Sequence, residues 1–300
     1  MKTISRDVGI IYEFNETNQP IATVASGSIV RVETYDCFKN QIDSENMALT
    51  DLDWDQINPA TGPIFVEDAK PGDVLKVTIH TIEIDSQGVM LVGPNLGVMG
   101  HQIDKLNAKI LPIENDKILF NELLLPLNKM IGVIGVAPSG QGVNCGTPGA
   151  HGGNMDNKMV TEGATLYFPV AVEGALFGLG DFHAAMGDGE VSVSGVEVAG
   201  AATVTLEVIK GEHLEQPMLE NEDSFTQIAS AMTLDEASKI ATQLMINRLV
   251  ERTHMNVSEV TMLMSAVGQL EICQVVDPLV TVRFVVPKWL LSQLNATMIG

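Results

Sequence analysis

The sequence predicts a mainly β protein, with a β-sandwich over residues 1–211 and an α+β portion over residues 212–300. Two observations favour this class. From Asp7 to about Ile209, short β-branched stretches alternate with Gly, Pro, Asn and Asp, as strands alternate with turns. After about Gly211 the apolar residues recur at helical spacing instead. Many strands without intervening helices are typical of a sandwich or barrel.

Several segments of the first portion have the pattern of strands. The clearest is Val74–Ile84, where apolar and polar residues alternate directly after a Lys-Pro-Gly-Asp turn. The other predicted strands cover residues 21–32, 166–172, 175–179, 190–198 and 202–209.

The C-terminal portion begins with a predicted helix over residues 233–252. Thr233 and Glu236 have the spacing of a capping box at its start. Its apolar residues at helical spacing are Leu234, Ala237, Ala241, Leu244, Met245 and Leu249. Methionine-rich helix faces of this kind are typical of a core or an interface.

A second helix is predicted over residues 256–267, with Asn256 as its N-cap and Gly268 as its stop. A strand over residues 279–286 follows, and the proline that ends it begins a short helix over residues 287–294. The chain therefore returns to the sheet after its helices, which defines the α+β character of this portion.

The charge of the chain limits its partners. Its 300 residues carry 38 Asp and Glu against 17 Lys and Arg, a net charge of -21, and such a surface repels nucleic-acid phosphates and anionic membranes. A neutral or cationic small molecule fits this charge better. The apolar helix faces near the C-terminus favour a homodimer over a monomer.

The sequence shows the features of a cytoplasmic protein. We expect no transmembrane helix, because no apolar run approaches the 18 or more uncharged residues that a span needs. The first residues lack the apolar core of a secretory signal. The cysteines are three, Cys37, Cys145 and Cys273, and none forms a CxxC pair. An odd number without such pairs argues against a disulfide framework or a structural zinc site.

The segment GALFGLGDFHAAMGDGE, residues 174–190, carries the strongest chemical signal. Asp181 and His183 are two apart, so on a strand they project to the same face. Asp188 and Glu190 repeat that spacing in a glycine-rich turn. An ionised carboxylate within such an apolar stretch needs a partner or a metal ion. Either His183 or a divalent cation meets that need for Asp181.

Two other polar clusters are weaker candidates. Residues 142–156, GVNCGTPGAHGGNMD, form a glycine-rich loop that carries His151, Asn154 and Asp156, and it is either a binding loop or a tight surface crossing. Asp36 ends a predicted strand, together with a nearby Glu, where acids are usually solvated. We interpret the remaining histidines as structural or solvated: His80, His101, His213 and His254.

At these residues the chain resembles the acetamidase/formamidase family. The resemblance covers residues 26–288, and its most specific strings are VETYDCFKNQI, TPGAHGGNMD, GDFHAAMGDGE and QVVD followed by FVVPK. It implies a β-sandwich of jelly-roll type with an added α+β portion, assembled as dimers. It also implies hydrolysis of formamide or acetamide to a carboxylate and ammonia. The longer formamidase branch has Trp-Thr-Gly-Gly where this chain has residues 37–40, so the shorter acetamidase-like branch is nearer and the preferred amide stays open.

Other nucleophile classes receive little support from the sequence. It contains no Gly-x-Ser-x-Gly elbow of a serine hydrolase. A Cys-Glu-Lys arrangement of the nitrilase type is not indicated either. Neither Cys37 nor Cys145 is expected to act as a nucleophile. The remaining chemistry is that of carboxylates and imidazole, most simply around a metal-activated water.

The hypothesis drawn from these residues is a divalent metal site. Asp36, Asp181 and His183 are the predicted ligands, with zinc as the first choice of ion. Calcium, held by oxygens of Asp188 and Glu190, is the alternative. A non-catalytic metal- or sugar-binding sandwich is the alternative function.

The remaining candidate residues take roles around that ion. Glu190 is the predicted general base, with Asp188 as second choice. His151 is a further ligand or an oxyanion donor. The predicted substrate-binding residues on the same loop are Gly152, Gly153 and Asn154.

Overall fold

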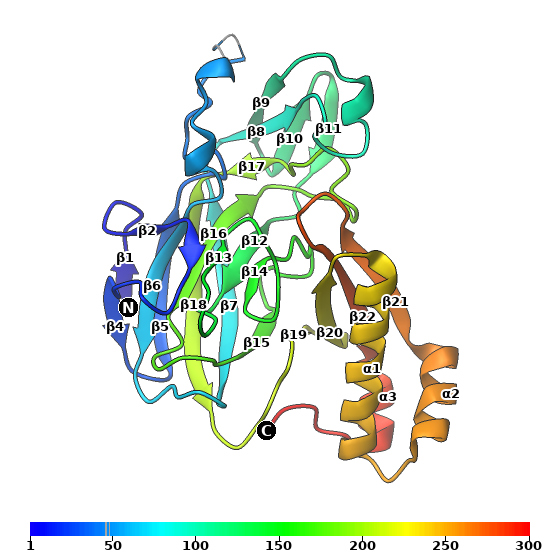
Figure 1. The fold of residues 1–300 in the computed structure, drawn as a ribbon. Helices are drawn as coiled ribbons and strands as arrows, with labels where there is room; N and C mark the ends of the chain where they lie inside the picture. Colours follow the sequence, from blue (N-terminus) through cyan, green and yellow to red (C-terminus); the bar gives the residue numbers. More distant parts are fainter. Residues whose placement is uncertain (46, 48) are drawn as a thin grey trace.

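The computed structural model describes residues 1–45, 47 and 49–300 and is mainly β (Figure 1). In this part of the chain, the first large sheet consists, in spatial order, of β1 (Lys2–Ile4), β5 (Ser28–Thr34), β18 (Gly200–Ile209), β7 (Val74–Ile84), β15 (Thr165–Pro169), β19 (Met218–Glu220), β20 (Ser224–Ala231), β22 (Val280–Pro287) and β21 (Gln269–Gln274). All neighbours are antiparallel except the parallel pair β1 and β5.

The second large sheet holds the central segment of the sequence. Its main path runs through β11 (Leu123–Pro126), β10 (Lys117–Phe120), β9 (Asn107–Glu114), β8 (Gln87–Val92), β17 (Glu197–Val198), β16 (Phe177–His183), β12 (Met130–Gly135) and β14 (Gly152–Asn154). β6 (Ala60–Val66) also pairs with β16, and β2 (Ile10–Ile11) and β4 (Ala22–Val24) pair with β6. Outside it, β3 (Glu13–Phe14) pairs with β13 (Val143–Asn144).

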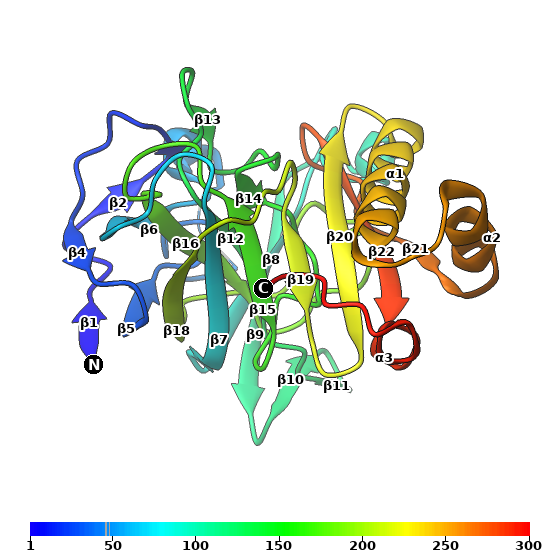
Figure 2. The ribbon, with the colours of Figure 1, turned by 90° about the horizontal axis from the view of Figure 1, so that it is seen from below.

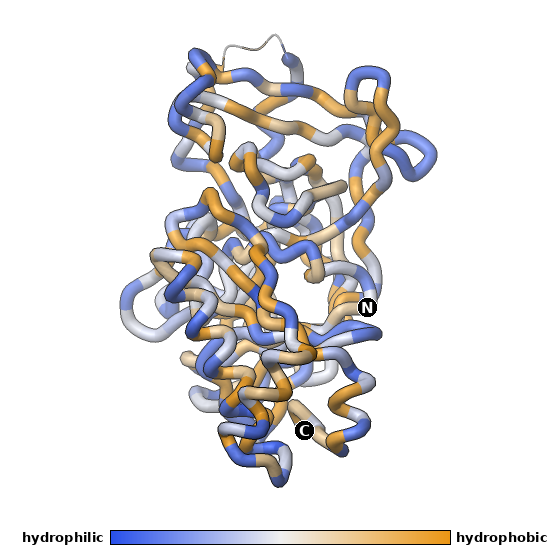
Figure 3. Tube along the Cα trace, turned by 90° about the vertical axis from the view of Figure 1, so that its right-hand side faces the viewer, coloured by the Kyte–Doolittle hydropathy of each residue, from blue (hydrophilic) through white to orange (hydrophobic). Residues whose placement is uncertain are grey.

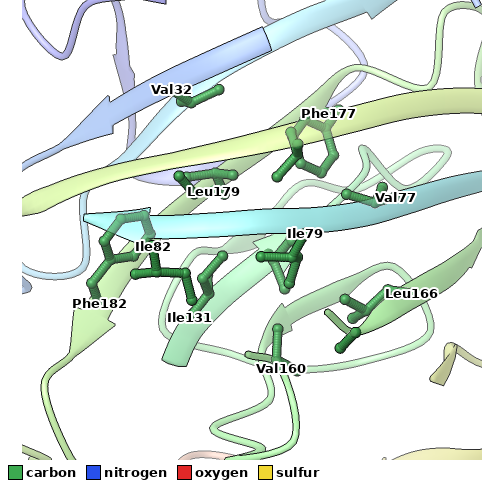
Figure 4. Close-up of a cluster of buried hydrophobic side chains, with 14 of the residues drawn as sticks. Val32, Val77, Ile79, Ile82, Ile131, Val160, Leu166, Phe177, Leu179 and Phe182 are labelled. Atoms are coloured by element: carbon green, nitrogen blue, oxygen red, sulfur yellow. The ribbon is translucent and has the colours of Figure 1, made fainter. Parts of the chain in front are cut away.

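The main hydrophobic core is built from residues of both sheets. Period-2 alternation on β7 buries Leu75, Val77 and Ile79, while the residues between them are partly exposed. The second sheet contributes Ile131 and Phe177, which lie in the same cluster (Figure 4). Each such side chain contributes roughly 1.5–3 kcal/mol on burial, so this core accounts for much of the fold's stability.

The C-terminal helices cover one end of the first sheet. α1 (Leu234–Arg252) packs against β20 and β22, α2 (Val257–Val267) lies beside α1, and α3 (Lys288–Leu294) follows and contacts β22 (Figures 1 and 2). Hydrophobic and hydrophilic residues alternate along these helices (Figure 3), because only one face of each is buried. The buried residues of α1 are Ala237, Ala241, Met245, Arg248 and Leu249.

The predicted helix starts are confirmed, but only half of the capping box predicted at Thr233 and Glu236 is formed. The Thr233 hydroxyl accepts a hydrogen bond from the Glu236 N–H at the start of α1. At α2 the capping box is complete, because Asn256 and Glu259 each accept from the other's backbone N–H, and Gly268 ends the helix. Short 3-10 helices cover Leu49–Asp51, Trp54–Gln56 and Gly100–Gln102.

Most predicted strands are present, and one prediction is wrong. Residues 74–84 form β7 with the predicted bounds, whereas residues 21–32 are divided between β4 and β5 by a turn. Residues 190–198 were expected to be one strand, but only β17 lies there. Glu190 and Val193 have positive φ, and the Val193 N–H donates to the Glu190 carbonyl, so the chain turns instead of extending.

The mainly β class with C-terminal helices is confirmed, while the jelly-roll connectivity and the division at residue 211 stay predictions. Among the described helices, none combines the length and apolar character that a membrane crossing requires.

Candidate active site

Strand β16 brings the predicted pair Asp181 and His183 into the interior. Both side chains are buried, and β16 lies between β12 and β17. In this register His183 is directly opposite Glu197, a residue that the sequence analysis did not assign. A carboxylate from a neighbouring strand therefore joins the Asp-x-His pair.

Four carboxylates surround the Nε2 atom of His183. The Glu197 Oε2 atom lies 3.1 Å away and the Asp181 Oδ1 atom 3.5 Å away. The Asp156 Oδ1 atom follows at 3.8 Å and the Glu190 Oε1 atom at 4.0 Å. All five side chains are buried. We call these residues the acid cluster: Asp156, Asp181, His183, Glu190 and Glu197.

Three acids of the cluster are held by left-handed backbone. The φ angles are 40° at Asp156, 57° at Asp181 and 44° at Glu190. This conformation is uncommon for residues other than glycine, and strain of this kind concentrates at functional sites. For Asp181 it occurs inside β16, so the strand departs from regular geometry at the residue whose carboxylate faces the histidine.

Two glycines leave room for the cluster. A β-carbon at Gly132 would lie 2.5 Å from the Asp156 Oδ1 atom and closer still to the Asp181 Oδ2 atom. A β-carbon at Gly195 would lie 2.6 Å from the His183 Nδ1 atom. Real β-carbons do not approach so closely, so the cluster can form only if the residues at Gly132 on β12 and Gly195 before β17 are glycines.

The C-terminal portion contributes a further acid. Asp277, in the loop after β21, accepts a hydrogen bond of 3.1 Å from the Asn154 side chain. The same strand holds the glycine-rich turn, since Gly189 N–H donates to the Cys273 carbonyl. Burial and the Asp156 carboxylate raise the pKa of Asp277 well above its usual value. Residues from both predicted portions of the chain therefore meet at the cluster.

The electrostatics of the cluster favour either shared protons or a cation. Burial and the Asp181 carboxylate raise the pKa of Asp156 to about 7, and burial raises the pKa of Glu197 to about 8. Burial and Asp156 also raise the pKa of Glu190 well above its usual value. Burial lowers the pKa of His183, but Glu197 and Asp181 outweigh it and raise that pKa well above normal. One imidazolium cannot neutralise this many acids.

Several buried atoms of the cluster have no hydrogen-bond partner among the described residues. These atoms are both carboxylate oxygens of Asp156, Asp181 Oδ1, Glu197 Oε2 and His183 Nδ1. Buried polar groups are usually satisfied, so this concentration requires an explanation. A divalent cation supplies one, because it accepts several oxygens at once and offsets their charge. The ligand atoms of Asp156, His183 and Glu190 all lie within 4.8 Å of one another, which fits such an ion.

Asp36 lies at the edge of the cluster. Its carboxylate accepts a 2.6 Å hydrogen bond from the Asn40 N–H, and the side chain is buried. Burial and the nearby Asp181 carboxylate raise the pKa of Asp36 to about 6, although the Asn40 N–H opposes the shift. The predicted ligands Asp181 and His183 are therefore together, with Asp36 beside Asp181 but partly engaged by its own loop.

The glycine-rich loop places His151 at the start of β14. Its ring packs edge-on against Phe14 with 5.3 Å between ring centroids. Burial lowers the pKa of His151 to about 4, so the ring is neutral at physiological pH. Its Nε2 atom has no partner in the described structure. Gly152 and Gly153 pair with Gly135 and Ile134 of β12, so the loop is part of the sheet that carries the cluster.

Asp188 faces away from the cluster toward two cations. Its carboxylate oxygens accept hydrogen bonds of 2.9 and 2.7 Å from Arg283, and Lys158 lies 2.7 Å away. Although burial opposes it, Arg283 and Lys158 lower the pKa of Asp188. The structure therefore separates Glu190, which faces His183, from Asp188, which is bound in ion pairs.

Sequence reasoning missed three residues near the centre. Asp156 was noted on its loop but given no role, and Glu197 and Asp277 were not singled out. Glu197 had the same signal as Asp181, since a carboxylate stands between Val196 and Val198. The four histidines interpreted as structural or solvated are exposed: His80, His101, His213 and His254.

An apolar cavity of about 460 Å³ borders the cluster at Glu190. Its lining includes Met90, Phe120 and Val196, and it also includes Gly195, which lies against the His183 ring. Glu190 is thus a member of the cluster that also lines a cavity open to a small molecule. The remaining lining comes mainly from the segment between β16 and β17, with Leu125 and Pro126 of β11.

A mainly β fold around buried carboxylates and one imidazole defines a protein with an interior acidic centre suited to a divalent cation. The Acetamidase/Formamidase family model matches residues 13–144 and 140–238. The chain belongs to this family.

Solved structures agree with this assignment. A predicted acetamidase/formamidase from Thermoanaerobacter tengcongensis is 49% identical, with 98% of each chain covered and a TM-score of 0.96. An acetamidase from Bacillus halodurans is 44% identical, with 98% of this chain and 100% of that chain covered and a TM-score of 0.96. A curated formamidase from Methylophilus methylotrophus is 26% identical over 253 residues, 63% of this chain. The chain spans 61% of the length of that relative.

Proposed function

We propose that this protein hydrolyses short aliphatic amides to a carboxylate and ammonia, with a divalent cation bound in the acid cluster. The observation that carries the proposal is the set of unpaired buried oxygens around His183 in a member of the acetamidase/formamidase family. The relatives named for formamidase and acetamidase activity support the substrate class. We infer cytoplasmic location from the three free, buried cysteines.

We assign the cation to His183, Asp156 and Asp181. The His183 Nε2 atom lies 3.5 Å from the Asp181 Oδ1 atom and 3.8 Å from the Asp156 Oδ1 atom, and these short distances support the assignment. A nitrogen ligand among carboxylates favours zinc over calcium. We propose that Asp36 supports Asp181 and does not bind the ion itself, because one of its oxygens already accepts a hydrogen bond from the Asn40 N–H.

Glu190, rather than Asp188, is proposed as the general base. When bound, the cation polarises the amide carbonyl and lowers the pKa of a water molecule. Glu190 accepts the proton of the attacking water as its oxygen bonds to the carbonyl carbon. It then delivers that proton to the nitrogen as the carbon–nitrogen bond breaks and ammonia leaves. Its position 4.0 Å from the His183 Nε2 atom and in the cavity wall suits both steps.

The remaining predicted residues position the substrate. The neutral ring of His151 can donate a hydrogen bond to the developing oxyanion from its unpartnered Nε2 atom. Gly152 and Gly153 allow close backbone approach at this edge. Asn154 holds Asp277 against the cluster. The apolar cavity accepts the acyl group of the amide.

Ammonia release from formamide, acetamide and propionamide tests the proposal. Protein purified without chelator should release ammonia, lose the activity on chelation and regain it with zinc. His183→Ala should lose both metal and activity. His80→Ala is the matched control, because His80 is exposed on β7 and bonds only to Thr205 among the described residues.

Full activity in stripped protein or in a folded His183→Ala variant would refute the metal mechanism. A chain that binds the ion but releases no ammonia from any of the three amides would instead support the non-catalytic metal-binding alternative.

We also propose a homodimer formed through the C-terminal portion. The edge strand β21 exposes Leu270 and Ile272, α2 exposes Met262 and α3 exposes Trp289. Light scattering should give twice the mass of one chain, and Met262→Lys should shift the protein toward the monomer. A monomeric wild type at micromolar concentration would refute this interface.

A further inference from the structure

A cysteine lies against the acid cluster beside Asp181 and Glu197. Cys37 follows β5, and its sulfur lies within 4.8 Å of carboxylate oxygens of Asp181 and Glu197, which also lie within that distance of each other. All three side chains are buried. The ligand set assigned above uses neither the thiol nor Glu197.

This group of three is unfavourable without a cation. The Glu197 Oε2 and Asp181 Oδ1 atoms are buried without a hydrogen-bond partner in the described structure. Two such carboxylates and a thiol within 4.8 Å of one another offer the ligand atoms of a metal site.

We infer that Cys37, Asp181 and Glu197 form a second metal subsite with a thiolate ligand. The inference concerns the same cluster as the proposed hydrolase and rests on that cluster being a metal centre. Asp181 is shared, since its Oδ1 atom faces His183 while the residue also belongs to the group of three. Asp181 would contribute to both positions, and two ions in one centre would supply the paired-metal chemistry of two-metal hydrolases. Binding at Cys37 releases the thiol proton to solvent as the sulfur–metal bond forms.

The donor atoms specify the kind of ion. Sulfur with carboxylate oxygen selects zinc or a similar borderline metal and disfavours calcium and magnesium, which prefer oxygen alone. The subsite at His183 offers nitrogen and oxygen only. The two positions therefore differ in chemistry, and the sulfur position is expected to discriminate more strongly against hard cations.

The other two cysteines provide internal controls. The Cys145 sulfur donates to the Ile11 carbonyl at 3.5 Å. The Cys273 sulfur lies 3.7 Å from an Arg283 nitrogen, so a cation already occupies its surroundings. Neither belongs to a group of metal-binding side chains among the described residues.

Cobalt substitution of the intact protein tests the inference. Stripped wild-type protein titrated with Co²⁺ should bind two ions per chain and develop the near-ultraviolet absorption of a thiolate–cobalt bond. Cys37→Ser, which keeps the size of the side chain, should bind one ion and lose that absorption. Glu197→Gln should likewise bind one ion. Cys145→Ser should behave as wild type, and thermal melting of each variant verifies folding.

A wild type that binds one ion without thiolate absorption would overturn the second subsite, as would thiolate absorption that persists in Cys37→Ser. Ammonia release measured on the same samples separates the two proposals. One ion with amidase activity leaves the hydrolase standing and removes the subsite. Two ions with thiolate absorption but no ammonia from any amide support the subsite and remove the hydrolase.

Discussion

Asp188 and Glu190 are two residues apart in one turn but have different partners. Asp188 accepts from the buried guanidinium of Arg283, whereas Glu190 faces His183. Asp188→Asn removes the charge from that ion pair and should lower the free energy of unfolding by roughly 1.5–3 kcal/mol. Metal content should be unchanged and ammonia release should stay within a few-fold of wild type.

Chemical denaturation, metal analysis and the ammonia assay on Asp188→Asn check this prediction. Glu190→Gln is the comparison variant, which should lose most activity. Wild-type stability combined with a large loss of rate in Asp188→Asn would give the catalytic role to Asp188 instead.

Gly132 is a residue whose missing side chain matters. Gly132→Ala would place a methyl group 2.5 Å from the Asp156 Oδ1 atom, so the carboxylates must move. We expect metal affinity to fall about 10- to 100-fold, as for other changes that displace ligands indirectly. Gly187→Ala is the control, because a β-carbon there has nothing within 4 Å. Equal metal affinity in the two variants, measured by competition with a chelating dye, would contradict the prediction.

At the residue scale, spacing in the sequence was informative only within one strand. Asp181 and His183 were expected on one face, and they do lie together, at 3.5 Å. Glu197 and Asp277 could not be placed, because their approach depends on which strands pair and on a loop far along the chain. Spacing carries no information about partners between strands until register is known.

At the scale of elements, α1 is joined to the loop between β18 and β19 by a buried ion pair. Arg248 donates to Glu212 at 3.1 Å, and Arg252 donates to the same carboxylate. Although burial opposes it, these hydrogen bonds lower the pKa of Glu212. A carboxylate with a lowered folded-state pKa stabilises the fold above its unfolded pKa, and that contribution is lost as pH falls through the folded pKa.

Glu212→Gln should therefore reduce stability by about 2 kcal/mol at pH 7 and make little difference at the acid end. Denaturant midpoints measured from pH 7 down to pH 3 check this. Glu215→Gln, at an exposed position on the same loop, should change stability little at either pH. A constant difference between Glu212→Gln and wild type across this range would show that the pair acts through packing.

Elements with strong local signals were predictable, and those shaped by the site were not. α1, α2 and β7 follow from spacing and caps that lie within their own residues. The segment at residues 190–198 alternates like a strand, yet Glu190 is held in a turn that directs its carboxylate to His183. In this segment the tertiary contacts of the acid cluster therefore outweighed the local strand propensity.

At the scale of the whole molecule, the two predicted portions are joined by hydrogen-bonded strands. β19 pairs with β15, so the first sheet continues from residues 1–211 into residues 212–300. The candidate site also depends on residues 212–300, because Asp277 bonds to Asn154 and the Cys273 carbonyl holds Gly189. A fragment of residues 1–211 would expose β15 as an edge and lack an acid of the centre.

We expect this fragment to aggregate on expression and to bind zinc at least tenfold more weakly than the full chain. Solubility, circular dichroism and metal titration of the fragment beside the full chain check the prediction. A soluble fragment that melts cooperatively and binds zinc as tightly as the full chain would show that residues 1–211 are an autonomous domain.

The left-handed backbone at Asp156, Asp181 and Glu190 sets activity against heat tolerance. Glycine at any of these positions would relax the main chain by about 1 kcal/mol and remove one charge from a crowded interior. Selection for thermal stability alone would therefore favour substitutions that abolish the activity. More thermostable variants of this chain must therefore gain stability in surface loops and at helix ends, while these three acids keep their strained backbone.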